Sequence, residues 1–155
     1  MSKKVYRPNV AAVIVSSSYP EVKEVFIAER SDIKDAWQFV QGGIDKGEAP
    51  KEALIREIEE EIGTSEVEIL SEYPEWISYD FPSRVAKKMK PYIGQTQRYY
   101  LVRLKPEAII NLETAHPEFC NYKYVAVETL FDHIAAFKKP VYEQVINYFK
   151  EEGLL

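Results

Sequence analysis

The chain has 155 residues, of which 46% are hydrophobic and 29% charged, and its formal net charge is −5. This size and composition predict one globular domain over residues 1–155, and the acidic charge argues against a protein that coats DNA or RNA. The single cysteine, Cys120, excludes an internal disulfide framework. No apolar run has the length of a signal-peptide core or a membrane span, so we expect a cytoplasmic protein without a membrane or DNA partner.

The first part of the chain reads as three strands followed by a helix. The expected strands are short apolar runs at residues 10–15 (VAAVIV), 24–29 (EVFIAE) and 37–40 (WQFV), the last ended by Gly42–Gly43. From Ala49–Pro50 to Ile62 the apolar residues recur at helical spacing, and Gly63 is a suitable C-cap. The apolar face of this predicted helix consists of Leu54, Ile55, Ile58 and Ile62.

The second part of the chain alternates strands with a basic segment and ends in a helix. Strand patterns cover residues 66–78, 96–104 (TQRYYLVRL) and 122–127 (YKYVAV), while residues 81–94 (FPSRVAKKMKPYIG) read as a loop. Helical patterns resume from about Thr129, and Pro140 suits the first turn of a last helix that runs to Gly153. Strands interspersed with helices in this way predict an α+β fold in which a mixed β-sheet is sandwiched between α-helices.

The first predicted helix contains a crowded run of glutamates, in the stretch REIEEEIGT (residues 56–64). At about 100° of rotation per residue, Glu57, Glu60 and Glu61 share one face, whereas Glu59 lies near the solvent side. A solvated acidic face is the ordinary interpretation of such a run. However, Glu57 and Glu61 oppose each other at i and i+4, where a basic partner is usual and like charges repel.

A divalent cation would resolve this repulsion. Carboxylate oxygens on one rigid face suit Mg²⁺ or Mn²⁺, and the preceding Gly42–Gly43 turn allows the backbone to come close to a ligand. The run is therefore a candidate metal site.

Eight positions of this region also match a known motif. The sequence fits the Nudix box at Gly42, Glu48, Arg56, Glu57, Ile58, Glu60, Glu61 and Gly63, with Thr64 in place of the usual Ile, Leu or Val. The chain thus resembles the Nudix hydrolases. The resemblance implies the Nudix fold with its loop–helix–loop, hydrolysis of phosphoric anhydride bonds, and a structural pairing of Arg56 with Glu48. It further implies two or more divalent ions, Mg²⁺ or alternatively Mn²⁺ or Zn²⁺, held by the metal ligands Glu57, Glu60 and Glu61.

Shorter motifs along most of the chain resemble one branch of this family. Their order and spacing from Tyr6 to about Tyr148 are similar to the bacterial RNA pyrophosphohydrolases, a group formerly classed with dinucleoside polyphosphate hydrolases. The motifs are residues 6–10 (YRPNV), 37–44 (WQFVQGGI), 79–82 (YDFP), 93–100 (IGQTQRYY) and 117–119 (PEF). The resemblance implies removal of phosphates from the 5′-triphosphate or 5′-diphosphate end of RNA, which leaves a 5′-monophosphate and triggers mRNA decay.

The same resemblance assigns site residues outside the helix. Glu118 matches an acidic residue that completes the catalytic and metal-binding set, and the backbone carbonyl near Gly42 is a further candidate metal ligand. The residues assigned to the substrate are Arg30, Tyr79 and Lys138 for the 5′ phosphates, Phe137 for stacking on a base, and Arg7 and Arg84 near the expected mouth. The ordinary alternative for each is a solvated charge or a packed aromatic ring.

Two positions differ from the branch. Ala135 stands where a larger aliphatic residue usually completes the base clamp, and Ala36 stands where a hydroxyl donor is common. Phosphates can still be attracted by a basic rim composed of Arg30, Arg84, Lys87, Lys88, Lys90, Lys138 and Lys139.

We expect a metal-activated water to attack phosphorus, with a glutamate that the sequence does not identify as the base. The nearest alternative is hydrolysis of a dinucleoside polyphosphate such as diadenosine tetraphosphate, because the same metal face and basic residues serve either substrate. A second alternative is a nucleotide-binding Nudix domain without activity, but the chain retains every glutamate of the box. The oligomeric state has no signal in the sequence.

Overall fold

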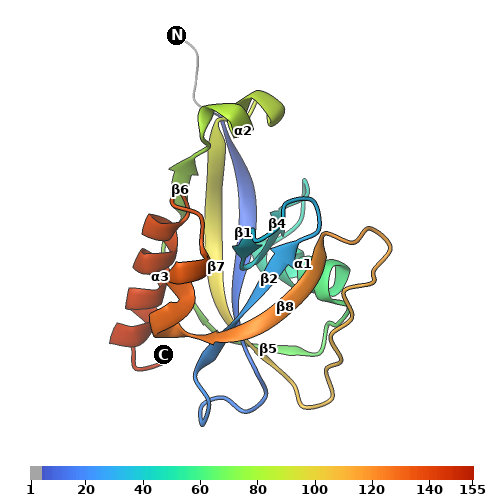
Figure 1. Ribbon diagram of the computed structural model, residues 1–155, viewed down its shortest axis with the longest axis vertical. Coiled ribbons are helices and arrows are strands. Elements are labelled where there is room, and N and C mark those ends of the chain that lie inside the picture. The colour runs from blue at the N-terminus through green and yellow to red at the C-terminus, as the bar shows by residue number, and fades with distance from the viewer. Residues whose placement is uncertain (1–4) are drawn as a thin grey trace.

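A computed structural model describes residues 5–155, in which a mixed β-sheet lies between helices (Figure 1). The strands are β1 (Tyr6–Val15), β2 (Glu24–Arg30), β3 (Trp37–Gln38), β4 (Val40–Gly43), β5 (Val67–Glu72), β6 (Ile77–Asp80), β7 (Gly94–Leu104) and β8 (Phe119–Ala126). The helices are α1 (Pro50–Ile62), α2 (Ser83–Lys88) and α3 (Lys139–Glu151), with a 3₁₀ helix η1 (Val127–His133) before the last one. The α+β architecture agrees with the one expected from the sequence.

The centre of the sheet is the parallel pair β1–β7, which runs from Tyr6 opposite Gly94 to Val15 opposite Arg103. The path through the sheet is β3-β2-β1-β7-β5, and β4, β6 and β8 pair with β1, β7 and β2 respectively. β6 pairs with the first residues of β7, whereas β4 pairs with the middle of β1. β6 and α2 lie toward the same end of the sheet, with β4 beside the middle of β1 (Figure 1).

Each face of the sheet carries its own hydrophobic core. Val13 belongs to the core that packs against α3, with Tyr142 and Val145, whereas its neighbour Ile14 belongs to the core that packs against α1, with Ile58. Successive side chains of a strand point to opposite faces. A strand that is covered on both faces is therefore apolar at every position, which explains the continuous run VAAVIV.

The expected third strand differs from the structure. It is divided into β3, which pairs with β2, and β4, which pairs with β1. The break falls at Phe39, whose ring stacks on Tyr142 with 4.2 Å between ring centroids. Gly42 and Gly43 are the last two residues of β4, opposite Val10 and Asn9, so the strand ends at the expected glycines but includes them.

Three other boundaries also differ. Residues 66–78 form two strands that both pair with β7, interrupted at Pro74, which has no N–H for a sheet. The expected loop at residues 81–94 contains α2, which begins directly after Pro82. Helical structure resumes at Val127, as a 3₁₀ helix, and not near Thr129. Among residues 5–155, no helix is long and apolar enough to cross a membrane.

Candidate active site

Local signals at both ends position α1. Pro50 occupies its first turn, and the carboxylate of Glu52 accepts a hydrogen bond from the Ala49 N–H at 3.3 Å. At the other end Gly63 has a φ of 80°, and its N–H donates to the Glu59 carbonyl at 3.0 Å. Buried Leu54, Ile58 and Ile62 fix the rotation of the helix, while Ile55, expected on the apolar face, is only half-buried.

Arg56 connects the helix to the loop and the strand before it. Its Nε and Nη2 each donate to the Glu48 carboxylate at 2.8 Å, and Nη2 also donates to the Gly43 carbonyl at 2.9 Å. Nη1 donates to Glu57 at 2.8 Å. The hydrogen bonds from Arg56 lower the pKa of Glu48 to about 2. The Arg56–Glu48 pairing expected from the sequence is thus present, and it holds β4 against α1.

The absence of a side chain at Gly42 makes room for Glu57. A Cβ atom at Gly42 would overlap the carboxylate of Glu57. The pKa of Glu57 is raised, chiefly by burial, although the charge and hydrogen bond of Arg56 oppose this effect. The backbone of Gly42 and the carboxylate of Glu57 therefore lie side by side.

Glu61 lies deeper than any other glutamate of the helix. It is only 5% exposed, and its Oε2 is buried without a hydrogen-bond partner. Burial, followed by the nearby charge of Glu118, raises the pKa of Glu61 to about 10. Glu118 reaches this point from the segment before β8, where its carbonyl accepts hydrogen bonds from the Ser31 N–H at 2.8 Å and from the Ser31 hydroxyl at 2.9 Å.

These carboxylates suit a divalent cation. A buried carboxylate oxygen without a partner is unfavourable, and a nearby cation would favour its charged form. In the part of the chain that the structure describes, no three acidic, histidine or cysteine side chains are yet arranged around one point as a metal cluster. Glu57, Glu61 and Glu118 are the carboxylates that lie beside the point where two depressions of the surface meet.

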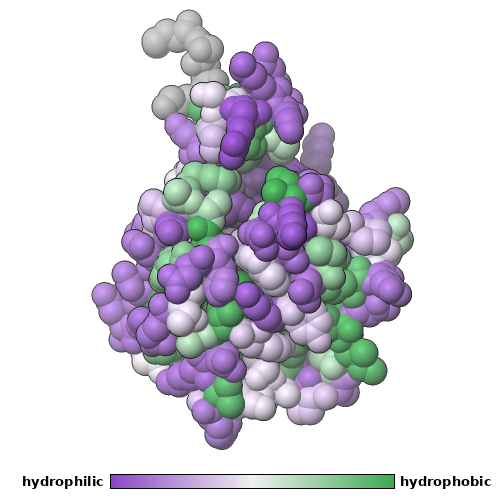
Figure 2. All heavy atoms as spheres, in the orientation of Figure 1, coloured by the Kyte–Doolittle hydropathy of each residue, from purple (hydrophilic) through white to green (hydrophobic). Residues whose placement is uncertain are grey.

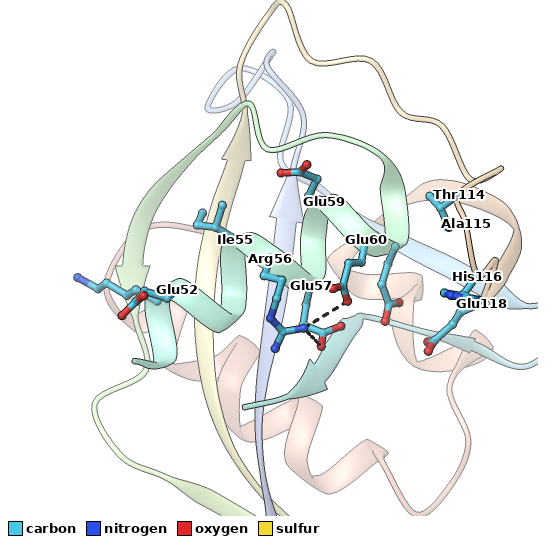
Figure 3. Close-up of a pocket in the computed structure, with 12 residues that line it drawn as sticks. Glu52, Ile55, Arg56, Glu57, Glu59, Glu60, Thr114, Ala115, His116 and Glu118 are labelled. Atoms are coloured by element: carbon cyan, nitrogen blue, oxygen red, sulfur yellow. Dashed lines mark hydrogen bonds and ion pairs between the residues drawn. The ribbon is translucent and has the colours of Figure 1, made fainter. Parts of the chain in front are cut away.

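The remaining two glutamates of the run differ from these. The Glu60 side chain is 58% exposed, and its Oε2 accepts from Arg56 Nη1 at 3.2 Å. Glu59 is exposed and points away from Glu57, on the side expected from the helix geometry (Figure 3). The three expected ligands on α1 are therefore unequal: Glu61 is buried, Glu57 is partly buried and Glu60 is at the surface.

An acidic hollow and a cation-lined cleft meet at three carboxylates, of which Glu61 is buried, Glu57 is partly buried and Glu118 is exposed. The hollow lies between α1 and the segment 114–118, and Glu52, Glu59 and Glu60 add to its negative charge (Figure 3). The cleft has a volume of about 590 Å³ and lies on the other side. Both share Glu57, Glu61 and Glu118. The hollow is predominantly acidic, whereas in the cleft the cations Arg7, Arg30, Lys88 and Lys138 lie beside the carboxylates.

The cleft gathers most of the predicted substrate residues from distant parts of the sequence. Its lining includes Arg7, Arg30, Tyr79, Phe137 and Lys138, together with Gly42. Arg84 is not brought to the cleft, because it lies on an exposed side of α2, and Lys88 from the same helix lines the cleft in its place. Glu60 does not line the cleft either.

Two cationic side chains of the cleft, Lys138 and Arg30, differ in their surroundings. Lys138 is 9% exposed, and its Nζ donates to the Gln38 side-chain oxygen at 2.9 Å. Burial, followed by repulsion from Arg30, lowers the pKa of Lys138 to about 8. Arg30 is more exposed and forms a bidentate ion pair with Asp32, with Nε–Oδ1 at 2.9 Å and Nη2–Oδ2 at 2.6 Å.

Aromatic rings line another part of the cleft. The Tyr79 ring centroid lies 6.0 Å from that of Phe137 and 5.9 Å from that of Phe81. The Tyr79 hydroxyl donates to the Gln95 side-chain oxygen at 3.2 Å, and burial raises the pKa of Tyr79 to about 12. Tyr79 therefore acts as a neutral hydrogen-bonding group.

Sequence reasoning missed several residues of the cleft. Amide side chains from strands β1, β3, β4 and β7 line it, namely Asn9, Gln38, Gln41 and Gln95. Buried Gln97 donates to Asn9 at 2.9 Å and to Gln41 at 3.0 Å. The sequence does contain a signal for these residues, because Asn and Gln side chains stand within otherwise apolar strands. Apolar residues of α2 were missed as well, because that segment was interpreted as a loop.

Comparisons with known proteins agree with this geometry. A family model described as the NUDIX domain matches residues 5–145. Curated proteins named RNA pyrophosphohydrolase are similar over almost their whole length. The one from a Nitratiruptor species is 63% identical over 99% of both chains, and the one from Helicobacter pylori is 57% identical over 100% of both.

Solved structures share the fold at low sequence identity. An E. coli dihydroneopterin triphosphate pyrophosphohydrolase aligns with a TM-score of 0.71 and 22% identity, over 93% of this chain and 99% of that one. A C. elegans Ap4A hydrolase aligns with a TM-score of 0.66 and 17% identity, over 93% and 98% of the two chains. Nudix hydrolases generally use divalent metals. The chain belongs to the Nudix family and, within it, to the RNA pyrophosphohydrolases, which are hydrolases that act on pyrophosphate bonds.

Proposed function

We propose that this protein removes phosphates from the 5′-triphosphate or 5′-diphosphate end of cytoplasmic RNA and leaves a 5′-monophosphate, which triggers mRNA decay. The observation that carries the proposal is the continuity of the cleft. It joins the carboxylates of Glu57, Glu61 and Glu118 to the cations Arg30 and Lys138, and to the ring of Phe137. An RNA 5′ end presents the matching sequence of groups, a polyphosphate followed by bases that can stack.

The cations of the cleft bind the phosphate chain. The hydrogen-bond partner of Lys138 is a neutral amide, so its positive charge remains available to a phosphate. A charge-assisted hydrogen bond is about twice as strong as a neutral one. To bind a phosphate, Arg30 must give up its ion pair with Asp32. Arg7 lies next to β4, where a Cβ atom at Gly43 would overlap its guanidinium.

The carboxylates hold divalent cations in this proposal. Glu57, Glu61 and Glu118, together with Glu60 and the Gly42 carbonyl, would bind two or more Mg²⁺ ions, with Mn²⁺ or Zn²⁺ as alternatives. When bound, such ions neutralise phosphate charge and lower the pKa of a coordinated water.

The protein's own groups then handle orientation and protons. Arg56 fixes the Glu57 carboxylate through its 2.8 Å hydrogen bond. One carboxylate of the group formed by Glu57, Glu61 and Glu118 accepts a proton from the attacking water. The water oxygen forms a bond to phosphorus, the anhydride bond breaks, and the leaving phosphate departs from the cleft.

A substrate comparison tests the proposal. The protein is given 5′-triphosphate RNA, 5′-diphosphate RNA and diadenosine tetraphosphate at equal concentration with Mg²⁺, and the products are separated and quantified. We expect the higher kcat/KM on the RNA ends, with 5′-monophosphate RNA as the product. A dominant rate on diadenosine tetraphosphate would replace this function with the dinucleoside polyphosphate alternative.

A further inference from the structure

Helix α2 and the residue after it direct two apolar side chains into the cleft. Val85 and Met89 are spaced by four residues and both line the cleft, whereas Arg84 and Lys87 are exposed and do not. No residue of α2 is buried, so the helix adds nothing to either hydrophobic core. Figure 2 shows mainly hydrophilic residues on the projection that α2 forms, with hydrophobic residues exposed directly below it. Val85 and Met89 are each partly buried where they line the cleft.

Helix α2 is anchored at its base and lies near the β2–β3 loop at the mouth of the cleft. At its base, the Phe81 N–H donates to the Ile93 carbonyl at 2.7 Å, and the Tyr6 hydroxyl donates to Asp80 at 2.6 Å. At the mouth, the pKa of Asp32 is lowered, chiefly by its hydrogen bond with Arg30 and to a smaller extent by the charge of Lys88. Lys88 of α2 therefore lies near the loop between β2 and β3.

The aromatic side chain of Phe137 lacks the larger aliphatic partner that usually stands at position 135 in this branch. Phe137 lines the cleft, but Ala135 is exposed and does not line it. A nucleobase that enters the cleft has two ring faces, and Phe137 can stack on only one of them. Val85 and Met89, with the half-exposed Ile33 of the β2–β3 loop, are apolar groups available in the same cleft.

We propose that the Val85–Met89 edge of α2 forms the second wall of a nucleobase site, so that a base from the first two nucleotides of the RNA lies between this edge and Phe137. This inference rests on the proposed function and adds the residues that hold the base. The thioether of Met89 and the methyl groups of Val85 contact a ring face without requiring hydrogen bonds. The wall therefore binds any base, and Lys88 on the same helix attracts the phosphate that follows the base.

The test compares steady-state kinetics of Val85→Ser and Met89→Ala with those of the control Val22→Ser. Val22 is 40% exposed and does not line the cleft, so the control makes the same chemical change elsewhere. The substrates are one 5′-triphosphate RNA and two versions of it that lack the base at the first or at the second nucleotide. Thermal unfolding of each variant checks that it is folded.

We expect the two α2 variants to raise KM about threefold to tenfold on the intact RNA with kcat unchanged. On the RNA that lacks the bound base, their KM should equal that of the wild type, which identifies the nucleotide. Wild-type KM on every RNA, or the same increase on all three, would overturn the inference. An inactive wild type on 5′-triphosphate RNA would instead overturn the proposed function.

Discussion

The substitution Lys138→Met should stabilise the protein while weakening substrate binding. The shift of the Lys138 pKa from 10.5 to about 8 corresponds to an unfavourable free energy of about 3 kcal/mol at neutral pH. Methionine fills a similar volume without the charge. It leaves the Gln38 side-chain oxygen without its donor, which costs about 1 kcal/mol. The net gain should therefore be about 2 kcal/mol, or about 4–8 °C in Tm.

The pH dependence of this gain follows from the direction of the shift. Between pH 8 and 10.5 the unfolded chain binds more protons at this lysine than the folded protein does, so wild-type stability rises with pH in that interval. The cost of the buried charge is complete below about pH 8 and disappears above 10.5. The advantage of Lys138→Met should thus be constant from pH 6 to 7.5 and should shrink toward pH 10.

Two measurements test this reasoning. Urea unfolding of the wild type and Lys138→Met at pH 7 and pH 9.5 gives the stability difference, and steady-state kinetics at pH 7 gives KM. We expect KM on 5′-triphosphate RNA to increase about tenfold or more, because a charged hydrogen bond to phosphate is lost. A variant that is less stable at pH 7, or whose advantage is the same at both pH values, would refute the argument.

Three further predictions concern the neighbouring residues. Gly42→Ala should remain folded by circular dichroism but lose at least roughly 90% of kcat, because the new methyl group displaces the Glu57 carboxylate and misplacing a reacting group is costly; wild-type kcat would contradict the close packing of Gly42 on Glu57. Asp32→Asn should lower KM on 5′-triphosphate RNA by up to about fivefold, since it frees Arg30 from an exposed ion pair of about 1 kcal/mol or less, and a higher KM would show that Asp32 assists binding. Mg²⁺ should raise the Tm of the wild type in a thermal-shift assay, and EDTA should reverse the change, because the ion relieves repulsion between buried carboxylates; an equal rise for Glu61→Gln would place the ion elsewhere.

Local signals allowed the sequence to predict α1 closely. The predicted bounds match because Pro50 at the start, Gly63 at the end and the apolar spacing between them act within the helix itself. The strands that continue through the core were found for a similar reason, because both of their faces are apolar. The expectations that failed depend on partners distant in the sequence. The expected strand is divided because β3 pairs with β2, whereas β4 pairs with β1.

The same distinction applies to the site. Helical geometry placed Glu57, Glu60 and Glu61 on one face, but it could not rank them. Glu60 lies at the surface because Arg56 and solvent are its neighbours, while Glu61 is covered. Lys88 lines the cleft where Arg84 was expected, because the segment was interpreted as a loop, and a loop does not indicate which of its side chains face a cleft.

The most direct test of the account compares Glu57→Gln with Glu59→Gln on 5′-triphosphate RNA in the presence of Mg²⁺. The two substitutions make the same chemical change two residues apart on one helix, but Glu57 is buried against Gly42 and Glu59 is exposed and points away. The account predicts that Glu57→Gln loses roughly 100-fold or more of kcat while keeping its fold, and that Glu59→Gln retains wild-type kcat. Near-normal turnover of Glu57→Gln, or an equal loss in both variants, would contradict the assignment of catalysis to Glu57 and the neighbouring carboxylates Glu61 and Glu118.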